Sequence, residues 1–171
     1  MRRLVSSILG LSIIAGAGPA LAQDAAGPEL RSTHNDWAVY VRDLGEDLVC
    51  YAASAPVDAA PLSGDHDDVL FMVATWKSGA STDQPMLSTG YSLRLGAPSS
   101  ARVGSDRFRM FTDGAFAFIE EDEDQPRLVR AMKRGSSMRL ETVTAEGTQT
   151  TYEFSLSGVT AAIDAANVAC R

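Results

Sequence analysis

Short segments in which hydrophobic and polar residues alternate dominate the chain from residue 37 onward. A period of two is typical of strands that bury one face, and clusters of Gly, Pro, Asp and Ser separate the segments. In the first segment Trp37, Val39 and Val41 fall on one face. The nearly continuous apolar segment Val69–Trp76 is typical of a strand covered on both faces. We predict strands over residues 37–42, 48–52, 69–76, 86–95, 101–103, 108–111, 116–119, 138–144 and 150–156.

Two of the boundaries predict tight hairpins. Asp113-Gly114 separates Phe108–Phe111 from Phe116–Ile119, and both positions of an Asp-Gly turn accept a positive φ. Glu146-Gly147 turns the chain between the last two predicted strands, whose Thr, Tyr, Val and Phe residues suit a pleated sheet.

Two segments have a helical period instead of an alternating one. The first begins near Pro126, which suits a first helical turn, and Gly135 is placed to end it. The second begins near Ser157 as its N-cap and carries Ala166 and Cys170 on its apolar face. We therefore predict a mainly antiparallel all-β fold, a sandwich or barrel of about eight short strands with two short helices, one of them C-terminal.

The first residues have the pattern of a secretory signal peptide. Arg2 and Arg3 precede the apolar segment Leu4–Ala17, and Ala20-Leu21-Ala22 places small residues at both positions that define a cleavage site. The apolar segment is short for a membrane span of about 30 Å. We predict cleavage near Ala22 and a periplasmic or secreted product.

The rest of the chain divides into a leader and one domain. Residues 23–33 are small, polar and Pro-containing, and we predict a flexible leader there, followed by a single β-rich domain over residues 34–171. The 171-residue chain is 45% hydrophobic and 22% charged, which is ordinary for one soluble domain. Its formal charge of -7 disfavours nucleic acid as a partner. No later segment reaches the length of a membrane helix, so we expect a protein that does not span the membrane.

Cys50 and Cys170 are the two cysteines of the chain. Exported compartments are oxidising, and neither cysteine has a Cys-x-x-Cys partner or an adjacent His. We therefore predict one disulfide between them in place of a catalytic thiol. It would close a loop of roughly 120 residues, which the chain-entropy model values at about 4–5 kcal/mol.

Several short motifs resemble the invasion-associated locus B (IalB) family, in matching order. They are Asp36-Trp37, Cys50-Tyr51-Ala52, Val69–Thr75, Phe108–Thr112, Ala131–Met138, Ser155–Ala162 and Cys170. The resemblance implies an exported bacterial protein with a compact β-rich domain, and its namesake members are associated with invasion of host red cells. It supplies no catalytic residues to carry over. We interpret the motifs themselves as fold determinants.

Candidate catalytic chemistry is sparse. The histidines are His34 and His66, and in the absence of a Gly-x-Ser-x-Gly motif a hydrolase would need one of them to meet a serine and a carboxylate in space. No Gly-rich phosphate-binding loop occurs. We predict no catalytic residues and no cofactor, with a periplasmic hydrolase using His34 or His66 as the alternative.

Two acidic clusters are candidates for cation binding. Asp65, His66, Asp67 and Asp68 offer imidazole and carboxylate ligands, but consecutive side chains seldom point at one ion, so we predict no metal site there. Glu120–Asp124 offers oxygen ligands but lacks the alternating pattern and turn glycine of a calcium loop. A divalent-cation-binding envelope protein is a second alternative.

These observations lead to one main hypothesis. We expect an exported, non-enzymatic β-domain that acts through surface contacts with another protein or with the cell envelope. The sequence leaves the partner, the oligomeric state and the final location outside the cytoplasm open.

Overall fold

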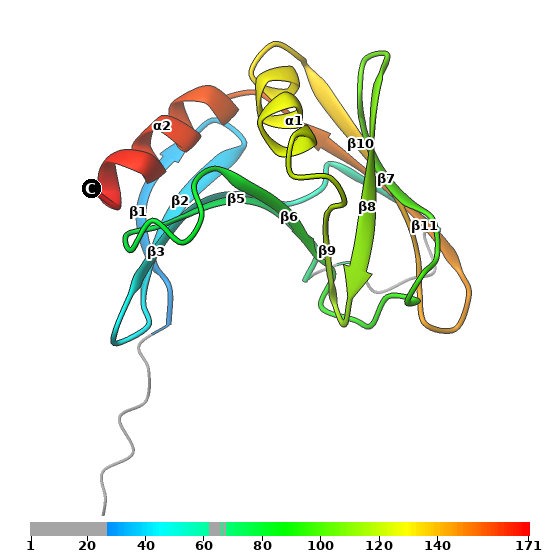
Figure 1. The fold of residues 1–171 in the computed structure, drawn as a ribbon. Helices are drawn as coiled ribbons and strands as arrows, with labels where there is room; N and C mark the ends of the chain where they lie inside the picture. The colour runs from blue at the N-terminus through cyan, green and yellow to red at the C-terminus, as the bar shows by residue number, and fades with distance from the viewer. Residues whose placement is uncertain (1–26, 62–65, 67) are drawn as a thin grey trace, which may run out of the picture.

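One bent antiparallel sheet with two helices on its inner side makes up the fold (Figure 1). The computed structural model describes residues 27–61, 66 and 68–171, and the eleven strands in this part of the chain pair in the order β1-β2-β3-β5-β6-β9-β8-β7-β10-β11-β4. The strands are β1 (Glu29–His34), β2 (Trp37–Asp43), β3 (Leu48–Ser54), β4 (Asp58–Ala60), β5 (Leu70–Trp76), β6 (Gln84–Ser88), β7 (Ser99–Val103), β8 (Asp106–Asp113), β9 (Phe116–Ile119), β10 (Ser137–Val143) and β11 (Gln149–Ser155). The helices are α1 (Asp124–Met132) and α2 (Val159–Ala169).

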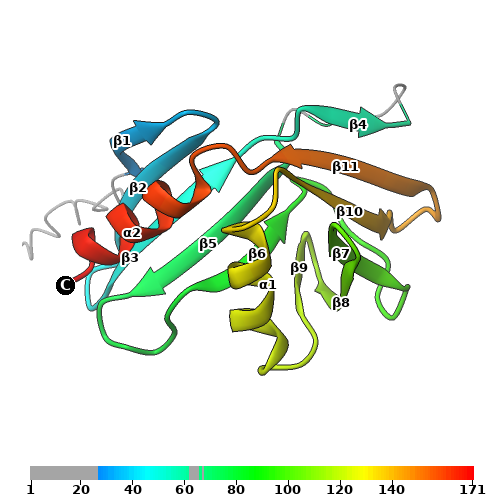
Figure 2. The same cartoon turned by 90° about the horizontal axis from the view of Figure 1, so that it is seen from above.

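The bend brings strands that are distant in the sheet order together across the core. Phe71 on β5 and Phe154 on β11 have ring centroids 5.9 Å apart. Trp37 Nε1 on β2 donates a hydrogen bond of 2.9 Å to the Ser155 carbonyl on β11. Figure 2 shows α2 lying along β2 and β3, while α1 packs against β6, β7 and β8. The mainly antiparallel, sandwich-like fold with a C-terminal helix is confirmed, and the sheet is not closed into a barrel.

The alternation of side chains in the first strands is confirmed on the inner face. The buried residues of β2 are Trp37, Val39 and Val41. In β5, Phe71 and Val73 are buried as well, but Leu70 is exposed and Met72 is half-buried. Full coverage of β5 on both faces was therefore a wrong prediction. Both helices pack on the inner face of the sheet, which leaves much of the outer face to solvent.

The count of about eight strands was too low because two edge strands lack a buried apolar face. β1 includes residues 29–33, so the prediction of a flexible leader is wrong for that part of the segment 23–33. Its side chains are exposed or half-buried, and backbone pairing with β2 orders it instead. β4 has three residues and pairs with β11 alone. The predicted signal peptide, residues 1–22, lies outside the described residues.

The strand predicted over residues 86–95 is too long. β6 ends at Ser88, and Gly90 follows with a φ of +69°. The hydroxyl of Thr89 lies 2.6 Å from the Tyr91 carbonyl oxygen and caps the turn. A Cβ at residue 90 would lie 2.5 Å from the Cβ of Asp68, so the chain needs glycine at this turn.

Two turns also differ from their predicted form. Helix α2 has Gly158 as its N-cap in place of Ser157, with a φ of +92°. A Cβ at residue 158 would lie 2.0 Å from the His34 carbonyl oxygen, which explains the glycine. Asp113 pairs with Phe116 at the end of the β8–β9 hairpin, so the two-residue loop starts one position later than predicted.

The predicted disulfide is confirmed. Cys50 on β3 is bonded to Cys170 directly after α2, with the two Cα atoms 5.7 Å apart. Both residues are buried. The bond ties the C-terminal helix to the sheet and leaves neither sulfur as a thiol.

Candidate functional site

Strand β8 separates its side chains strictly between the core and the outer face. The buried residues are Phe108, Met110 and Thr112. The outward residues Arg107, Arg109 and Phe111 are exposed. A phenylalanine that continues a row of exposed arginines does nothing for the core, and it makes this outer face the first candidate for a binding function.

Phe111, Phe116 and Phe118 form an aromatic cluster on the outer face of β8 and β9. Phe111 and Phe118 are cross-strand partners whose rings stack with centroids 5.5 Å apart. The ring of Phe116 lies 6.2 Å from that of Phe118. Phe111 is 48% exposed and Phe116 is 39% exposed, so the cluster presents apolar surface to solvent.

A hollow of about 650 Å³ lies next to the aromatic cluster. One wall is the loop Leu95–Pro98, whose Leu95 is 84% exposed, and Phe111 contributes to the lining. Arg107, Arg109 and Glu120 complete its polar side. The hollow therefore joins apolar and charged surface on one face.

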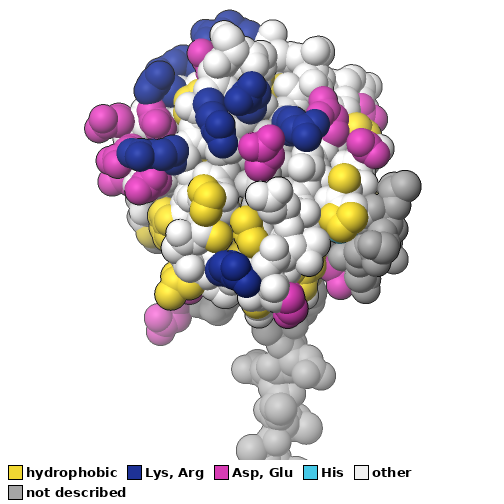
Figure 3. Space-filling model, turned by 90° about the vertical axis from the view of Figure 1, so that its right-hand side faces the viewer, with side chains coloured by type: hydrophobic (Ala, Val, Ile, Leu, Met, Phe, Trp, Pro, Cys, Tyr) yellow, Lys and Arg dark blue, Asp and Glu magenta, His cyan; other side chains and the backbone are white. Residues whose placement is uncertain are grey.

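Three arginines lie directly opposite one another on the same outer face. The strand register pairs Arg139 on β10 with Arg102 on β7, and Arg102 with Arg107 on β8. All three side chains are exposed, and we name them the arginine row. Figure 3 shows this side of the molecule, where Lys and Arg side chains gather above hydrophobic ones. Like charges placed directly opposite each other in a sheet are destabilising, so the fold does not require this row.

The nearby carboxylates only partly neutralise the arginine row. Glu141 is shared between two arginines, with one oxygen 3.5 Å from Arg107 Nη2 and the other 3.5 Å from Arg139 Nε. Glu153 on β11 is the direct register partner of Arg139 but lies outside ion-pair distance. In the described part of the chain no carboxylate lies within 4 Å of Arg102. The surplus of positive charge therefore lies toward Arg102 and Arg107.

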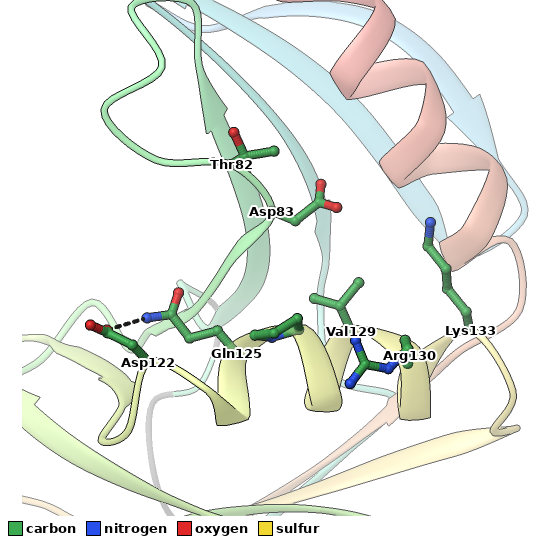
Figure 4. A pocket seen from close by; sticks show the side chains of 8 residues that line it. Thr82, Asp83, Asp122, Gln125, Val129, Arg130 and Lys133 are labelled. Carbon is green, nitrogen blue, oxygen red and sulfur yellow. Dashed lines mark hydrogen bonds between the residues drawn. The ribbon is translucent and has the colours of Figure 1, made fainter.

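A second cavity, of about 510 Å³, lies between α1 and the loop before β6 (Figure 4). Of its four charged groups, all but Arg130 have side-chain partners within the described residues, and Asp122 accepts a hydrogen bond of 3.1 Å from Gln125. Lys133 Nζ lies 2.9 Å from the Asp164 carboxylate, and the Asp83 carboxylate accepts a hydrogen bond of 2.8 Å from Asn167. Because these interactions would have to be broken before a charged ligand could bind, the cavity is the weaker candidate.

The histidines do not form a catalytic arrangement in the described residues. His34 Nε2 lies 3.0 Å from the Ser32 hydroxyl, but no carboxylate is within 4 Å of the ring to orient it. His66 Nε2 lies 2.8 Å from the Pro61 carbonyl oxygen, and its Nδ1 lies 3.2 Å from the hydroxyl of Tyr152. That tyrosine is buried, and burial raises its pKa well above the usual value. His66 therefore belongs to a structural hydrogen-bond network.

The acidic candidates that the structure describes are exposed or already paired. Asp65 and Asp67 lie outside the described residues, and Asp68 is exposed. In the segment 120–124, Glu120 pairs with Arg109 at 3.1 Å and Asp124 pairs with Arg127. Within the described ranges no group of three or more His, Cys, Asp or Glu side chains is arranged to hold a metal ion.

The arginine row and the aromatic cluster were not found from the sequence, although a signal for them exists. Residues 107, 109 and 111 occupy every second position of β8, and the apolar core residues occupy the positions between them. Because alternate residues of a strand point to opposite faces, this spacing gives an outward Arg-x-Arg-x-Phe pattern. The pairing of Arg102 with Arg107 and Arg139 depends on strand register, which short alternating segments do not specify.

The structure is that of an antiparallel β-domain with one disulfide and with exposed phenylalanines and arginines on its outer side. A model of the family described as "Invasion associated locus B (IalB) protein" matches residues 70–167, more than half of the chain. The chain belongs to the IalB family, as its motifs predicted. Comparison with curated proteins found no match, and comparison with solved structures found none either. In the part of the chain that the structure describes, no helix is long and apolar enough to cross a membrane.

The contacts of the resembling motifs explain them as fold determinants. The hydroxyl of Ser155 donates to the Asp36 carboxylate over 2.6 Å, and the Asp36 amide donates to the Ser157 carbonyl over 3.3 Å. Together with the Trp37–Ser155 hydrogen bond, these contacts join the β1–β2 turn to the segment before α2. The Asp36-Trp37 motif and the start of the Ser155–Ala162 motif are therefore two halves of one structural junction.

Proposed function

We propose that this chain is an exported, non-enzymatic β-domain that acts by contact with another protein through the outer face of β8 and β9. The aromatic cluster is the observation that carries the proposal. Covering two half-exposed phenylalanines and Leu95 with a partner would contribute about 3–5 kcal/mol of hydrophobic free energy. The neighbouring hollow supplies a shape for a partner side chain to enter.

Export is part of the proposal. It includes cleavage of the signal peptide near Ala22 and a location in the periplasm or outside the cell. The Cys50–Cys170 disulfide and the IalB family fit an extracytoplasmic protein. An oxidising compartment is where such a bond persists.

The non-enzymatic part of the proposal is supported by the state of the thiols and histidines in the described residues. The disulfide removes both thiols as nucleophiles, and His34 and His66 have no orienting carboxylate among the described residues. Turnover of a defined substrate that is abolished by His34→Ala or His66→Ala would overturn this part of the proposal.

Site-specific photo-crosslinking in the cells that naturally produce the protein tests the contact face. A photoreactive amino acid replaces Phe116, and a second version places it at Val168 on α2, which is 62% exposed and lies away from the aromatic cluster. We expect an adduct with a different protein at position 116 and none at position 168. No adduct at position 116, or equal adducts at both positions, would contradict the proposal.

A further inference from the structure

The arginine row has a stability cost that nothing else in the described fold explains. Arg102 stands directly between Arg139 and Arg107 in the register, with a like charge on each side. The one carboxylate that bridges this row, Glu141, is itself about half exposed and makes contacts of 3.5 Å. Exposed ion pairs of this kind are weak, so an incoming carboxylate can compete with Glu141 for the same guanidinium groups.

We propose that the arginine row binds one carboxylate side chain of an extended segment in the protein partner, while an aromatic side chain of the same segment packs on the aromatic cluster. The inference rests on the proposed function of this face and names the chemistry of its partner. Guanidinium groups present several donors in a plane and bind carboxylates through charge-assisted hydrogen bonds.

The spacing of the two subsites defines the partner sequence. Arg107 and Phe111 lie four residues apart on β8 and point to the same face, so they are separated by about 13 Å along the strand. An extended peptide has the same rise per residue and also repeats its orientation every second residue. A segment that runs along β8 therefore matches the surface when Glu and Phe are four residues apart.

The other charges on this face favour a protein segment over a lipid surface. Asp113 is exposed beside the aromatic cluster and would repel a layer of lipid phosphates, and Glu120 neutralises Arg109 there by an ion pair of 3.1 Å. The formal charge of the whole chain, -7, also repels an anionic membrane surface as the protein approaches it. A single carboxylate on the arginine row carries far less charge than a lipid surface, so both repulsions are smaller, and the hollow beside Phe111 accommodates a side chain.

Peptide binding to the full chain with its disulfide intact tests the inference. The probe, named the Glu–Phe peptide, is a short Ser/Thr peptide that carries one Glu and, four residues later, one Phe. One control peptide replaces Glu with Gln, and another separates Glu and Phe by three residues, which places them on opposite faces of an extended chain. We expect the Glu–Phe peptide to bind about tenfold more tightly than either control, measured by fluorescence anisotropy.

A matched pair of protein variants locates the effect. Arg102→Gln removes the member of the arginine row that has no ion pair among the described residues, and Arg42→Gln removes an exposed arginine, likewise without an ion pair among those residues, from β2. We expect Arg102→Gln to weaken binding of the Glu–Phe peptide about tenfold and to leave binding of the Gln control peptide unchanged. We expect Arg42→Gln to change the binding of neither peptide. Thermal unfolding of each variant shows that both remain folded.

The outcomes separate this inference from the proposed function. Equal binding of the Glu–Phe peptide and its Gln control overturns the inference, and crosslinking at position 116 then still supports the contact face. Binding to phosphatidylglycerol vesicles that is lost in Arg102→Gln, without peptide binding, overturns it in favour of a lipid partner. Failure of crosslinking at position 116 together with Arg102-dependent peptide binding would instead contradict the proposed function in cells.

Discussion

The junction between the β1–β2 turn and helix α2 differs sharply from the outer face of β7, β8 and β10. At the junction, Asn35 donates to the Ser157 hydroxyl over 3.1 Å, Asp36 accepts from Ser155, and a disulfide fixes the far end of the helix. On the outer face, arginines oppose arginines and phenylalanines remain in contact with water. In the first region the motifs stabilise the fold. In the second region the opposed arginines and exposed phenylalanines do not, and we interpret this difference as evidence of a binding function.

The largest effect that sharpens this comparison comes from the disulfide. The double variant Cys50→Ser with Cys170→Ser opens a loop with a sequence separation of 120 residues. We expect it to lose about 4–5 kcal/mol of unfolding free energy in the chain-entropy model. Urea unfolding measures the change, with the reduced wild-type chain as the control. A loss below about 1 kcal/mol would show that α2 docks on the sheet without its covalent tie.

Two phenylalanines on the same strand provide the next contrast. Phe108 is 2% exposed and Phe111 is 48% exposed. We expect Phe108→Ala to cost about 3–5 kcal/mol because it leaves a cavity, and Phe111→Ala to cost less than about 1 kcal/mol. Chemical unfolding of both variants measures the two losses of unfolding free energy. Similar losses would mean that the aromatic cluster is part of the core and not a contact surface.

A smaller effect is expected at the junction. Gly158→Ala places a Cβ 2.0 Å from the His34 carbonyl oxygen at a positive φ, so the turn has to shift, and we expect a loss of about 2 kcal/mol. Gly114→Ala is the control, because it also has a positive φ but nothing within 4 Å of the new Cβ. We expect about 1 kcal/mol there. Thermal unfolding distinguishes the two, and equal losses would leave backbone strain alone as the cause.

Structural features that depend on residues close together in the sequence were easier to predict than features that depend on pairing between distant strands. The alternation in β2, the β10–β11 hairpin and helix α1 depend on neighbouring residues, and each was predicted. The disulfide could be predicted because two cysteines allow one intramolecular pairing. β1 and β4 were missed because edge strands are ordered by backbone pairing and bury no apolar face.

The candidate site was harder to predict for a different reason. The arginine row consists of residues from three strands, and a shift of one residue in register would move its side chains to the other face. His34 and His66 drew attention because their chemistry is visible in the sequence. The contacts of His66 with Pro61 and Tyr152 then placed it in a structural network.

Thermal unfolding of wild type and Arg102→Gln, each with and without the Glu–Phe peptide, tests the central claim most directly. Without peptide we expect Arg102→Gln to be slightly more stable, by about 0.2–1 kcal/mol, because it relieves repulsion between opposite arginines. With peptide at about a hundred times its dissociation constant for wild type, the wild-type chain gains about 2.7 kcal/mol and the order reverses. A variant that is less stable than wild type without peptide, and equally stabilised by it, would contradict the account.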